Sequence, residues 1–216
     1  LYTGEYSQFW QKNRGSDASR NPGAQFVVSI QNHDQVGNRA GGERLGALVD
    51  FPSLKIAAGL LFFSPYIPLL FMGEEYAEKN PFLFFTDYED PKLKAAVSQG
   101  RKEEFKAFGW DNFPDPEEDS TFFSSRLTPR ENWDEQNKQM FAFYRDLITL
   151  RKSHPALSNL DKENTEVTVD KESQLVEIRR WHGSVELTAL FNLGENDFPL
   201  PASKGKQIFN AGWKKY

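Results

Sequence analysis

Two short polar runs carry the side chains best suited to chemistry. The first is Asn32-His33-Asp34-Gln35, and the second is Glu74-Glu75. A carboxylate can stabilise an oxocarbenium-like transition state, as in the cleavage of glycosidic bonds, and His, Asn and Gln side chains can bind hydroxyl groups. This combination of residue types is typical of a site that acts on a sugar.

Each polar run directly follows a segment predicted to be a buried β-strand. Residues 25–31 form a short, β-branched apolar segment, and residues 67–72 form a second apolar segment, which favours strands buried on both faces. A helix is predicted between them over residues 54–63, with a turn at Ser64-Pro65. This order predicts a parallel pair with a right-handed crossover. Because active sites lie at the carboxyl ends of such strands, we expect His33, Asp34 and one of the two glutamates to converge there.

The segment over residues 80–88 is an aromatic loop that contains Phe82, Phe84, Phe85 and Tyr88. These rings could form a wall against the apolar face of a sugar, or they could pack into the interior. The polar run after the first strand could equally be a turn whose Asn and Asp satisfy local backbone groups. Glu74-Glu75 could be a solvated helix start.

Composition excludes several classes of protein. The 216 residues include 26 Lys and Arg against 31 Asp and Glu, with a net charge of −5 and no Cys. Disulfide scaffolds and thiolate zinc sites are therefore excluded, and the acidic balance argues against a nucleic-acid partner. The three His, at positions 33, 154 and 182, are too scattered for a metal-binding helix, and residues 37–46 lack the ending of a phosphate loop. No metal or cofactor is expected.

Residues 56–72 contain no charged side chain. This stretch is short for a membrane span and is interrupted by Pro65 and Pro68, which disfavour a continuous helix. We therefore expect no membrane partner. The N-terminus shows no secretion signal and Cys is absent, so a cytoplasmic location is expected.

The rest of the chain divides into an α/β part over residues 1–155 and a small antiparallel β part over residues 156–216. Residues 1–24 are predicted to be loop with a short helix. Asp90-Pro91 should begin a helix that ends at Gly109 and breaks at Gly100. A capping box at Thr128–Glu131 should begin a short helix, and an amphipathic helix should end near Ser153. Strands are then predicted over residues 166–170, 174–181 and 185–193, with a hairpin turn at residues 182–184.

The two polar runs also carry a family resemblance. The segment FVVSIQNHDQVGNR (residues 26–39) resembles the fourth signature region of the α-amylase superfamily of glycoside hydrolases, and IPLLFMGEE (residues 67–75) resembles its eighth-strand signature. The extended pattern, which includes PFLFFTDYEDP, is similar to the malto-oligosyltrehalose trehalohydrolase family. The resemblance implies the last two βα units of a (β/α)8 barrel followed by a C-terminal antiparallel β domain.

The resemblance also implies roles for residues. Asp34 would be the acid that stabilises the transition state, and His33 would contact sugar hydroxyls. The substrate-binding residues would be Asn32, Gln35, Glu74 and Phe84. The substrate would be maltooligosyltrehalose or a related α-glucan, and the reaction would be hydrolysis of the α-1,4 bond next to the terminal trehalosyl unit, which releases trehalose.

The chain departs from the family pattern in one important respect. Family members use three carboxylates, and the nucleophile and the acid/base lie upstream of the NHD region. Only 31 residues precede Asn32, and Glu5 and Asp17 lie in loop-like sequence. The chain, which begins at Leu1 and not at Met, is therefore expected to be a C-terminal piece that is inactive alone. It is expected to shield its exposed barrel edge either by self-association or by refolding of its N-terminal segment.

Three other functions remain open from the sequence. The scaffold could belong to a glucan-branching transferase. It could be a catalytically silent barrel used for binding. Residues 156–216 could form a carbohydrate-binding module that uses Trp181 and Trp213, although no aromatic platform is obvious there.

Overall fold

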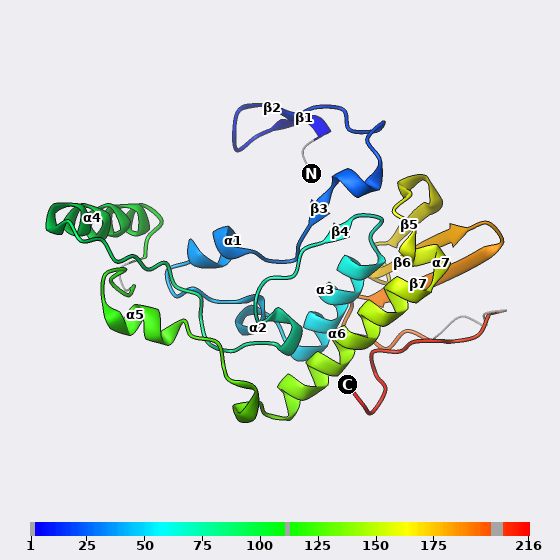
Figure 1. Cartoon of the computed structure of the whole chain (residues 1–216). Helices are drawn as coiled ribbons and strands as arrows, with labels where there is room; N and C mark the ends of the chain where they lie inside the picture. Colours follow the sequence, from blue (N-terminus) through cyan, green and yellow to red (C-terminus); the bar gives the residue numbers. More distant parts are fainter. Residues whose placement is uncertain (1–2, 111–112, 200–204) are drawn as a thin grey trace.

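The structure is a computed structural model that describes residues 3–110, 113–199 and 205–216. Within these ranges the strands form two sheets of two strands and one sheet of three. Figure 1 shows two long helices, α3 and α6, side by side, with the three-stranded sheet near one end of them and helices α4 and α5 on the opposite side of the molecule.

The strand, helix and strand predicted around the two polar runs are present. β3 (Val27–Val28) and β4 (Ile67–Pro68) pair in parallel, and α3 (Phe51–Phe63) lies in the connection between them. Backbone hydrogen bonds of 2.9 Å from Ile67 N to Phe26 O and of 2.8 Å from Leu69 N to Val28 O hold the pair. The parallel arrangement is therefore confirmed.

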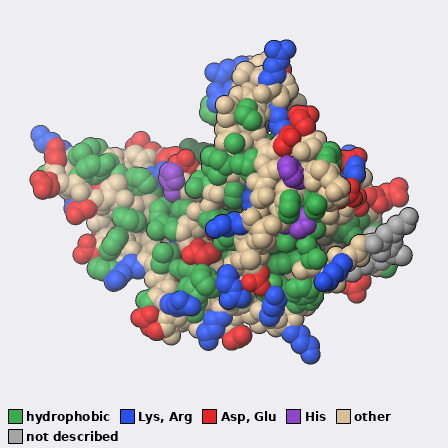
Figure 2. All heavy atoms as spheres, turned by 45° about the vertical axis from the view of Figure 1, so that its right-hand side comes forward, with side chains coloured by type: hydrophobic (Ala, Val, Ile, Leu, Met, Phe, Trp, Pro, Cys, Tyr) green, Lys and Arg blue, Asp and Glu red, His purple; other side chains and the backbone are tan. Residues whose placement is uncertain are grey.

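The length and the burial predicted for these two strands are wrong. Each strand has two residues, and 58% of Val27 is exposed. Pro68 has no N–H to extend a ladder, and no third strand flanks the pair within the described residues. Two strands alone cannot cover both of their faces, so apolar side chains reach the surface, and Figure 2 shows hydrophobic side chains in several patches over one face of the molecule.

The open edge of β3 leads to a first prediction. Unpaired strand edges beside exposed apolar side chains favour association with another chain. We expect light scattering of the purified 216-residue chain to give a mass above that of a monomer, and to fall toward it on dilution. A monomer at every concentration would contradict this expectation.

The N-terminal segment differs from its prediction of loop and short helix. β1 (Thr3–Ser7) and β2 (Lys12–Gly15) form an antiparallel hairpin, while residues 1–2 of the predicted loop lie outside the described ranges. In the turn, Phe9 and Trp10 pack edge to face at 5.0 Å between ring centroids. Polar residues without alternating hydrophobicity carry no strand signal, which explains why the sequence pattern did not indicate the hairpin.

The predicted helix starts are largely present. α3 begins at Phe51, three residues before the predicted start, because the Asp50 side chain accepts a hydrogen bond from Ser53 N and caps it. α4 (Pro91–Ala107) begins at the predicted Asp90 cap and is followed by Gly109 in the left-handed conformation. The predicted break at Gly100 is wrong, since an interior glycine costs only about 1 kcal/mol and the helix continues through it.

The predicted capping box at Thr128 is also wrong. Thr128 binds the Glu78 carboxylate instead, and a single 3-10 turn, η3 (Arg130–Asn132), follows it. The long helix α6 (Glu135–Ser153) begins at Asp134, whose side chain forms a reciprocal capping box with Asn137. Thr128 therefore donates its N–H and its hydroxyl to the distant Glu78 carboxylate instead of forming a local capping box.

The three strands predicted near the C-terminus form an antiparallel sheet in the order β5, β6, β7, with the bounds Thr165–Asp170, Leu175–His182 and Val185–Asn192. Phe63 of α3 packs against Phe191 of β7 with ring centroids 5.8 Å apart. A second core joins α3 to α6 through Ala58, Phe62, Met140, Phe143, Tyr144 and Leu147. Since α3 contacts the sheet as well as α6, the division at residue 155 stays a prediction.

Two buried arginines fix the end of α3. Arg151 donates hydrogen bonds to the carbonyls of Phe62, Ser64 and Tyr66, and Arg180 donates to the Ser64 carbonyl at 3.0 Å. The last carbonyls of a helix carry partial negative charge, so cations are favoured there. Burial lowers the pKa of Arg180 to about 10, so it remains charged at neutral pH and holds the turn that leads into β4.

The remaining elements are short. They are α2 (Leu45–Leu48), α5 (Asp119–Ser124), α7 (Pro155–Ser158), and the 3-10 turns η1 (Gly23–Gln25), η2 (Glu74–Tyr76) and η4 (Lys162–Asn164). None of the helices in the described part of the chain has the length and apolar character that a membrane crossing requires.

Candidate functional site

The first polar run forms the start of a short helix directly after β3. α1 spans His33–Gly37, and the Asn32 side chain caps it by accepting a hydrogen bond of 3.0 Å from Gln35 N. The cap places His33 and Asp34 in the first turn, with 72% and 75% of their side chains exposed. His33 Nε2 lies 3.3 Å from Asp34 Oδ1. An acid and an imidazole are therefore presented together to solvent, where a ligand can reach both.

The aromatic loop lies beside this helix. Arg101 of α4 stacks its guanidinium 4.2 Å from the ring centroid of Phe84, and it donates hydrogen bonds of 2.9 Å and 2.8 Å to Gly37 O and to Asn38 Oδ1. Arg101 thus connects the exposed Phe84 ring to the end of α1. Phe82 instead packs against Phe71, with ring centroids 5.2 Å apart, so this member of the loop has a packing role.

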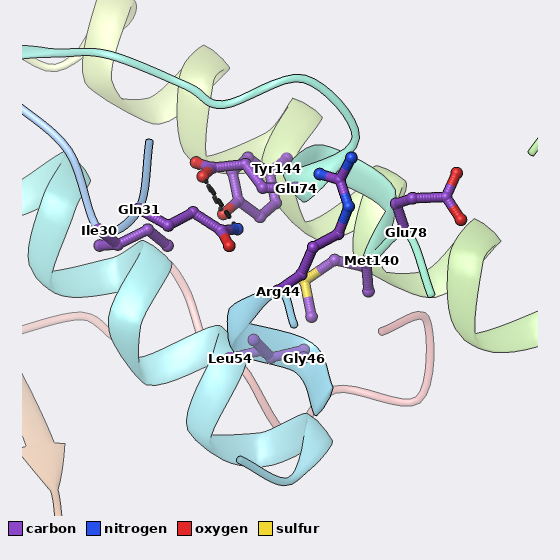
Figure 3. Close-up of a pocket in the computed structure, with 10 residues that line it drawn as sticks. Ile30, Gln31, Arg44, Gly46, Leu54, Glu74, Glu78, Met140 and Tyr144 are labelled. Carbon is purple, nitrogen blue, oxygen red and sulfur yellow. Dashed lines mark hydrogen bonds between the residues drawn. The ribbon is translucent and has the colours of Figure 1, made fainter. Parts of the chain in front are cut away.

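Glu74 does not share the exposed surface of His33 and Asp34. Only 6% of Glu74 is accessible, and its carboxyl accepts hydrogen bonds from Gln31 Nε2 at 3.3 Å and from the Tyr144 hydroxyl at 3.4 Å. Figure 3 shows these three side chains turned toward one another in a small internal pocket. The predicted direct contact of Glu74 with substrate does not fit this burial, and neither does a solvated helix start.

The burial has an electrostatic consequence. Removal of Glu74 from water disfavours its charged form, and this raises the pKa of Glu74 to about 7 despite the hydrogen bonds that it accepts. Burial and the nearby Glu74 carboxyl likewise raise the pKa of Tyr144. Near neutral pH a substantial fraction of Glu74 is therefore protonated.

Arg44 anchors the glycine-rich segment that follows α1. Its Nη1 donates to Met72 O at 2.7 Å and its Nε donates to Asn80 O at 2.8 Å. The guanidinium also lies 5.0 Å from the Phe71 ring centroid. Arg44 therefore holds this segment against residues 72–80. The sequence showed only that the segment is not a phosphate loop, and it did not indicate this structural role.

Glu78 is a second buried carboxylate, and it closes the loop that carries Thr128. It accepts hydrogen bonds from Asn80 N at 2.9 Å, Thr128 Oγ1 at 2.8 Å and the Tyr76 hydroxyl at 3.0 Å. Burial opposes ionisation, but the hydrogen bonds from Asn80, Thr128 and Tyr76 together outweigh it and lower the pKa of Glu78. The two buried acids of this segment therefore have opposite charge preferences.

Sequence reasoning missed Gln31, Arg44, Tyr144 and Glu78. Gln31 was assigned only to the end of a strand, and Tyr144 only to the apolar stripe of α6. Only Gln31 could have been found from the sequence, because a polar Gln at the end of an otherwise apolar segment indicates a possible buried hydrogen-bond partner. Within the described residues, no three His, Asp or Glu side chains gather as a metal site would require. The contacts of Asn32, Gln35 and Phe84 with substrate stay a prediction.

Comparisons with known proteins agree with the motifs. The chain is 48% identical over 159 residues to the malto-oligosyltrehalose trehalohydrolase of Saccharolobus solfataricus, and the match covers 74% of this chain and 27% of the relative. It is 37% identical over 210 residues to the malto-oligosyltrehalose trehalohydrolase of Brevibacterium helvolum, with 95% and 35% covered. A crystal structure from Salmonella typhimurium, assigned as an alpha amylase, has a TM-score of 0.83 and 38% identity, with 96% of this chain and 36% of that chain covered.

No model of a protein family matches the sequence. The chain spans about a third of the length of the curated relatives that it matches. The resemblance predicted from the NHDQ and MGEE segments is confirmed: this chain is similar in sequence to part of the malto-oligosyltrehalose trehalohydrolases.

Proposed function

We propose that this chain supplies the transition-state-stabilising carboxylate of a hydrolase that releases trehalose from maltooligosyltrehalose. The observation that carries the proposal is the joint exposure of His33 and Asp34 in the first turn of α1, directly after β3. Asp34 would stabilise positive charge on the anomeric carbon as the glycosidic bond breaks. His33 would bind hydroxyls of the same sugar, and Phe84 would cover its apolar face.

The fold proposed for this function is the end of a (β/α)8 barrel. β3, α3, β4 and α6 would be the last two βα units, and the sheet of β5, β6 and β7 would be the C-terminal domain. The parallel pairing of β3 with β4 supports this assignment, as does the exposure of their apolar side chains. Both features suit a pair of strands that further strands extend on either side to form a larger sheet.

Retaining hydrolysis of a glycosidic bond needs a nucleophile and an acid/base about 5 Å apart. The described residues present Asp34 beside His33, with no second exposed acid in α1. We therefore propose that the other two acids come from the part of the relatives that this chain does not match. The cytoplasmic location stays a prediction.

The test compares the chain alone with a chimera in which it replaces the matched segment of the Brevibacterium helvolum relative. We expect the purified 216-residue chain to release no trehalose from maltooligosyltrehalose, because it lacks the other two acids. The chimera should release trehalose, measured by chromatography of the products.

Each outcome discriminates between functions. Trehalose release by the isolated chain would contradict the proposed division of the catalytic acids. A folded chimera that transfers glucan chains without trehalose release would favour a branching transferase. A folded chimera that binds the substrate and leaves it intact would favour a silent binding protein.

A further inference from the structure

A buried hydrogen-bond relay connects α6 to Gln31, the residue that precedes the cap of α1. The Tyr144 hydroxyl donates to Glu74 Oε1 at 3.4 Å, and Gln31 Nε2 donates to Glu74 Oε2 at 3.3 Å. Gln31 Oε1 in turn accepts a hydrogen bond of 3.0 Å from Leu45 N. Gln31, Glu74 and Tyr144 are all buried, and Figure 3 shows the relay between the chain before α1 and helix α6.

The relay acts on the only irregular stretch between β3 and α1. β3 ends at Val28, residues 29–31 belong to neither a strand nor a helix, and the cap of α1 is Asn32. The Gln31 side chain therefore anchors the backbone one residue before the cap and three residues before Asp34. Contacts of Val36 and Gly37 hold the second half of α1, whereas its first turn follows directly from Gln31 and the Asn32 cap. A shift of Gln31 would therefore be transmitted to that first turn, since a five-residue helix forms few backbone hydrogen bonds of its own.

The chemistry of the pocket is unusual for a purely structural site. Glu74 forms no salt bridge among the described residues; the nearby Arg44 donates to main-chain carbonyls instead, and the other acids of this segment are Glu75 and Glu78. A buried acid without an ion pair costs stability, and an apolar side chain could fill the space more cheaply. Such exceptions to packing rules are concentrated at functional sites.

We propose that Glu74 and Gln31 are positioning residues that hold the first turn of α1, and with it Asp34, in the geometry needed for hydrolysis. This inference rests on the proposed function. The acceptor oxygens of Glu74 orient the Gln31 amide, and the Gln31 backbone then sets the direction in which α1 begins. Tyr144 orients the Glu74 carboxyl from the opposite side.

The first experiment measures hydrogen exchange in the 216-residue chain, so that it does not depend on catalysis. The probe is the Val36 amide, which donates to Asn32 O inside α1. We expect Glu74→Met and Gln31→Leu to increase its exchange roughly 10-fold, a change that corresponds to local opening. Glu74→Gln should retain the exchange rate of the unchanged chain, because a neutral amide can still hydrogen bond with Gln31 and Tyr144.

The second experiment measures trehalose release by the active chimera. Glu74→Met should lower kcat about 10- to 100-fold, since small misplacements of a catalytic group have effects of this size, while KM changes little. Glu74→Gln should restore most of kcat. Glu75→Met is the matched control: it removes the neighbouring acid, which takes no part in the relay, and kcat should stay close to that of the unchanged chimera.

The two experiments separate the failure of each proposal. Unchanged Val36 exchange in both Glu74→Met and Gln31→Leu would overturn the positioning role, whatever the chimera does. An effect of Glu75→Met equal to that of Glu74→Met would overturn it as well. If the exchange results are as expected but trehalose release by the folded chimera is unaffected by Glu74→Met, the relay holds α1 without serving hydrolysis.

Discussion

Replacing Asp34 with Asn in the chimera is expected to lower kcat for trehalose release by about 10²- to 10³-fold, the range for loss of one electrostatic stabiliser of a transition state. Asn has the same shape as Asp but no charge, so it cannot oppose the positive charge that develops on the sugar. Because that charge exists only in the transition state, kcat should fall much more than KM rises. Initial rates over a range of substrate concentrations would measure both.

The fold should tolerate this change. The Asp34 side chain is largely exposed, and polar contacts at the surface such as that with His33 contribute little to stability. Asp17→Asn is the matched control, since Asp17 is also exposed and only caps a turn at Ser19; we expect its activity to be unchanged. Activity of Asp34→Asn within about 3-fold of the parent chimera would remove the main support for the proposed function.

The second large effect is expected on stability. Glu78→Leu should lower the free energy of unfolding by about 3–5 kcal/mol, because it leaves the buried hydroxyl of Tyr76 and the half-buried N–H of Thr128 without their acceptor. For a chain of this size the melting temperature should fall by roughly 6–20 °C. Thermal unfolding followed by circular dichroism would measure the change, and Glu131→Leu, at an exposed position, should leave the melting temperature within about 2 °C of the unchanged chain.

The pH dependence of this effect has a defined sign. The folded state lowers the pKa of Glu78, so its stabilising contribution is fully present above the unfolded value of about 4.3 and is lost as the pH falls through the folded value. The difference in melting temperature between the unchanged chain and Glu78→Gln should therefore shrink as the solution is acidified below about pH 4.3. A difference that grows on acidification would show that Glu78 is not held as a carboxylate.

Local sequence patterns were sufficient for the elements that satisfy their own hydrogen bonds. Asp90-Pro91 predicted the start of α4 because cap and helix are adjacent in sequence. The turn residues 182–184 predicted the β6–β7 hairpin for the same reason. The motif around His33 and Asp34 indicated the family, and the comparisons confirmed that resemblance.

Elements that depend on distant partners were decided only by the tertiary structure. Thr128 carries a local capping signal, yet it binds Glu78, 50 residues away along the chain. Glu is a residue type that usually lies at the surface, yet Glu74 is buried. Its hydrogen-bond partners Gln31 and Tyr144 are 43 and 70 residues away along the chain.

The sequence by itself therefore determined which acid and imidazole follow the first strand of the parallel pair, and that a helix connects the two strands. Only the tertiary structure decided that Asp34 faces solvent while Glu74 lies inside. The physical reason is that hydrogen bonds within a turn are set by neighbouring residues, whereas burial and the charge of a carboxyl depend on which distant groups surround it.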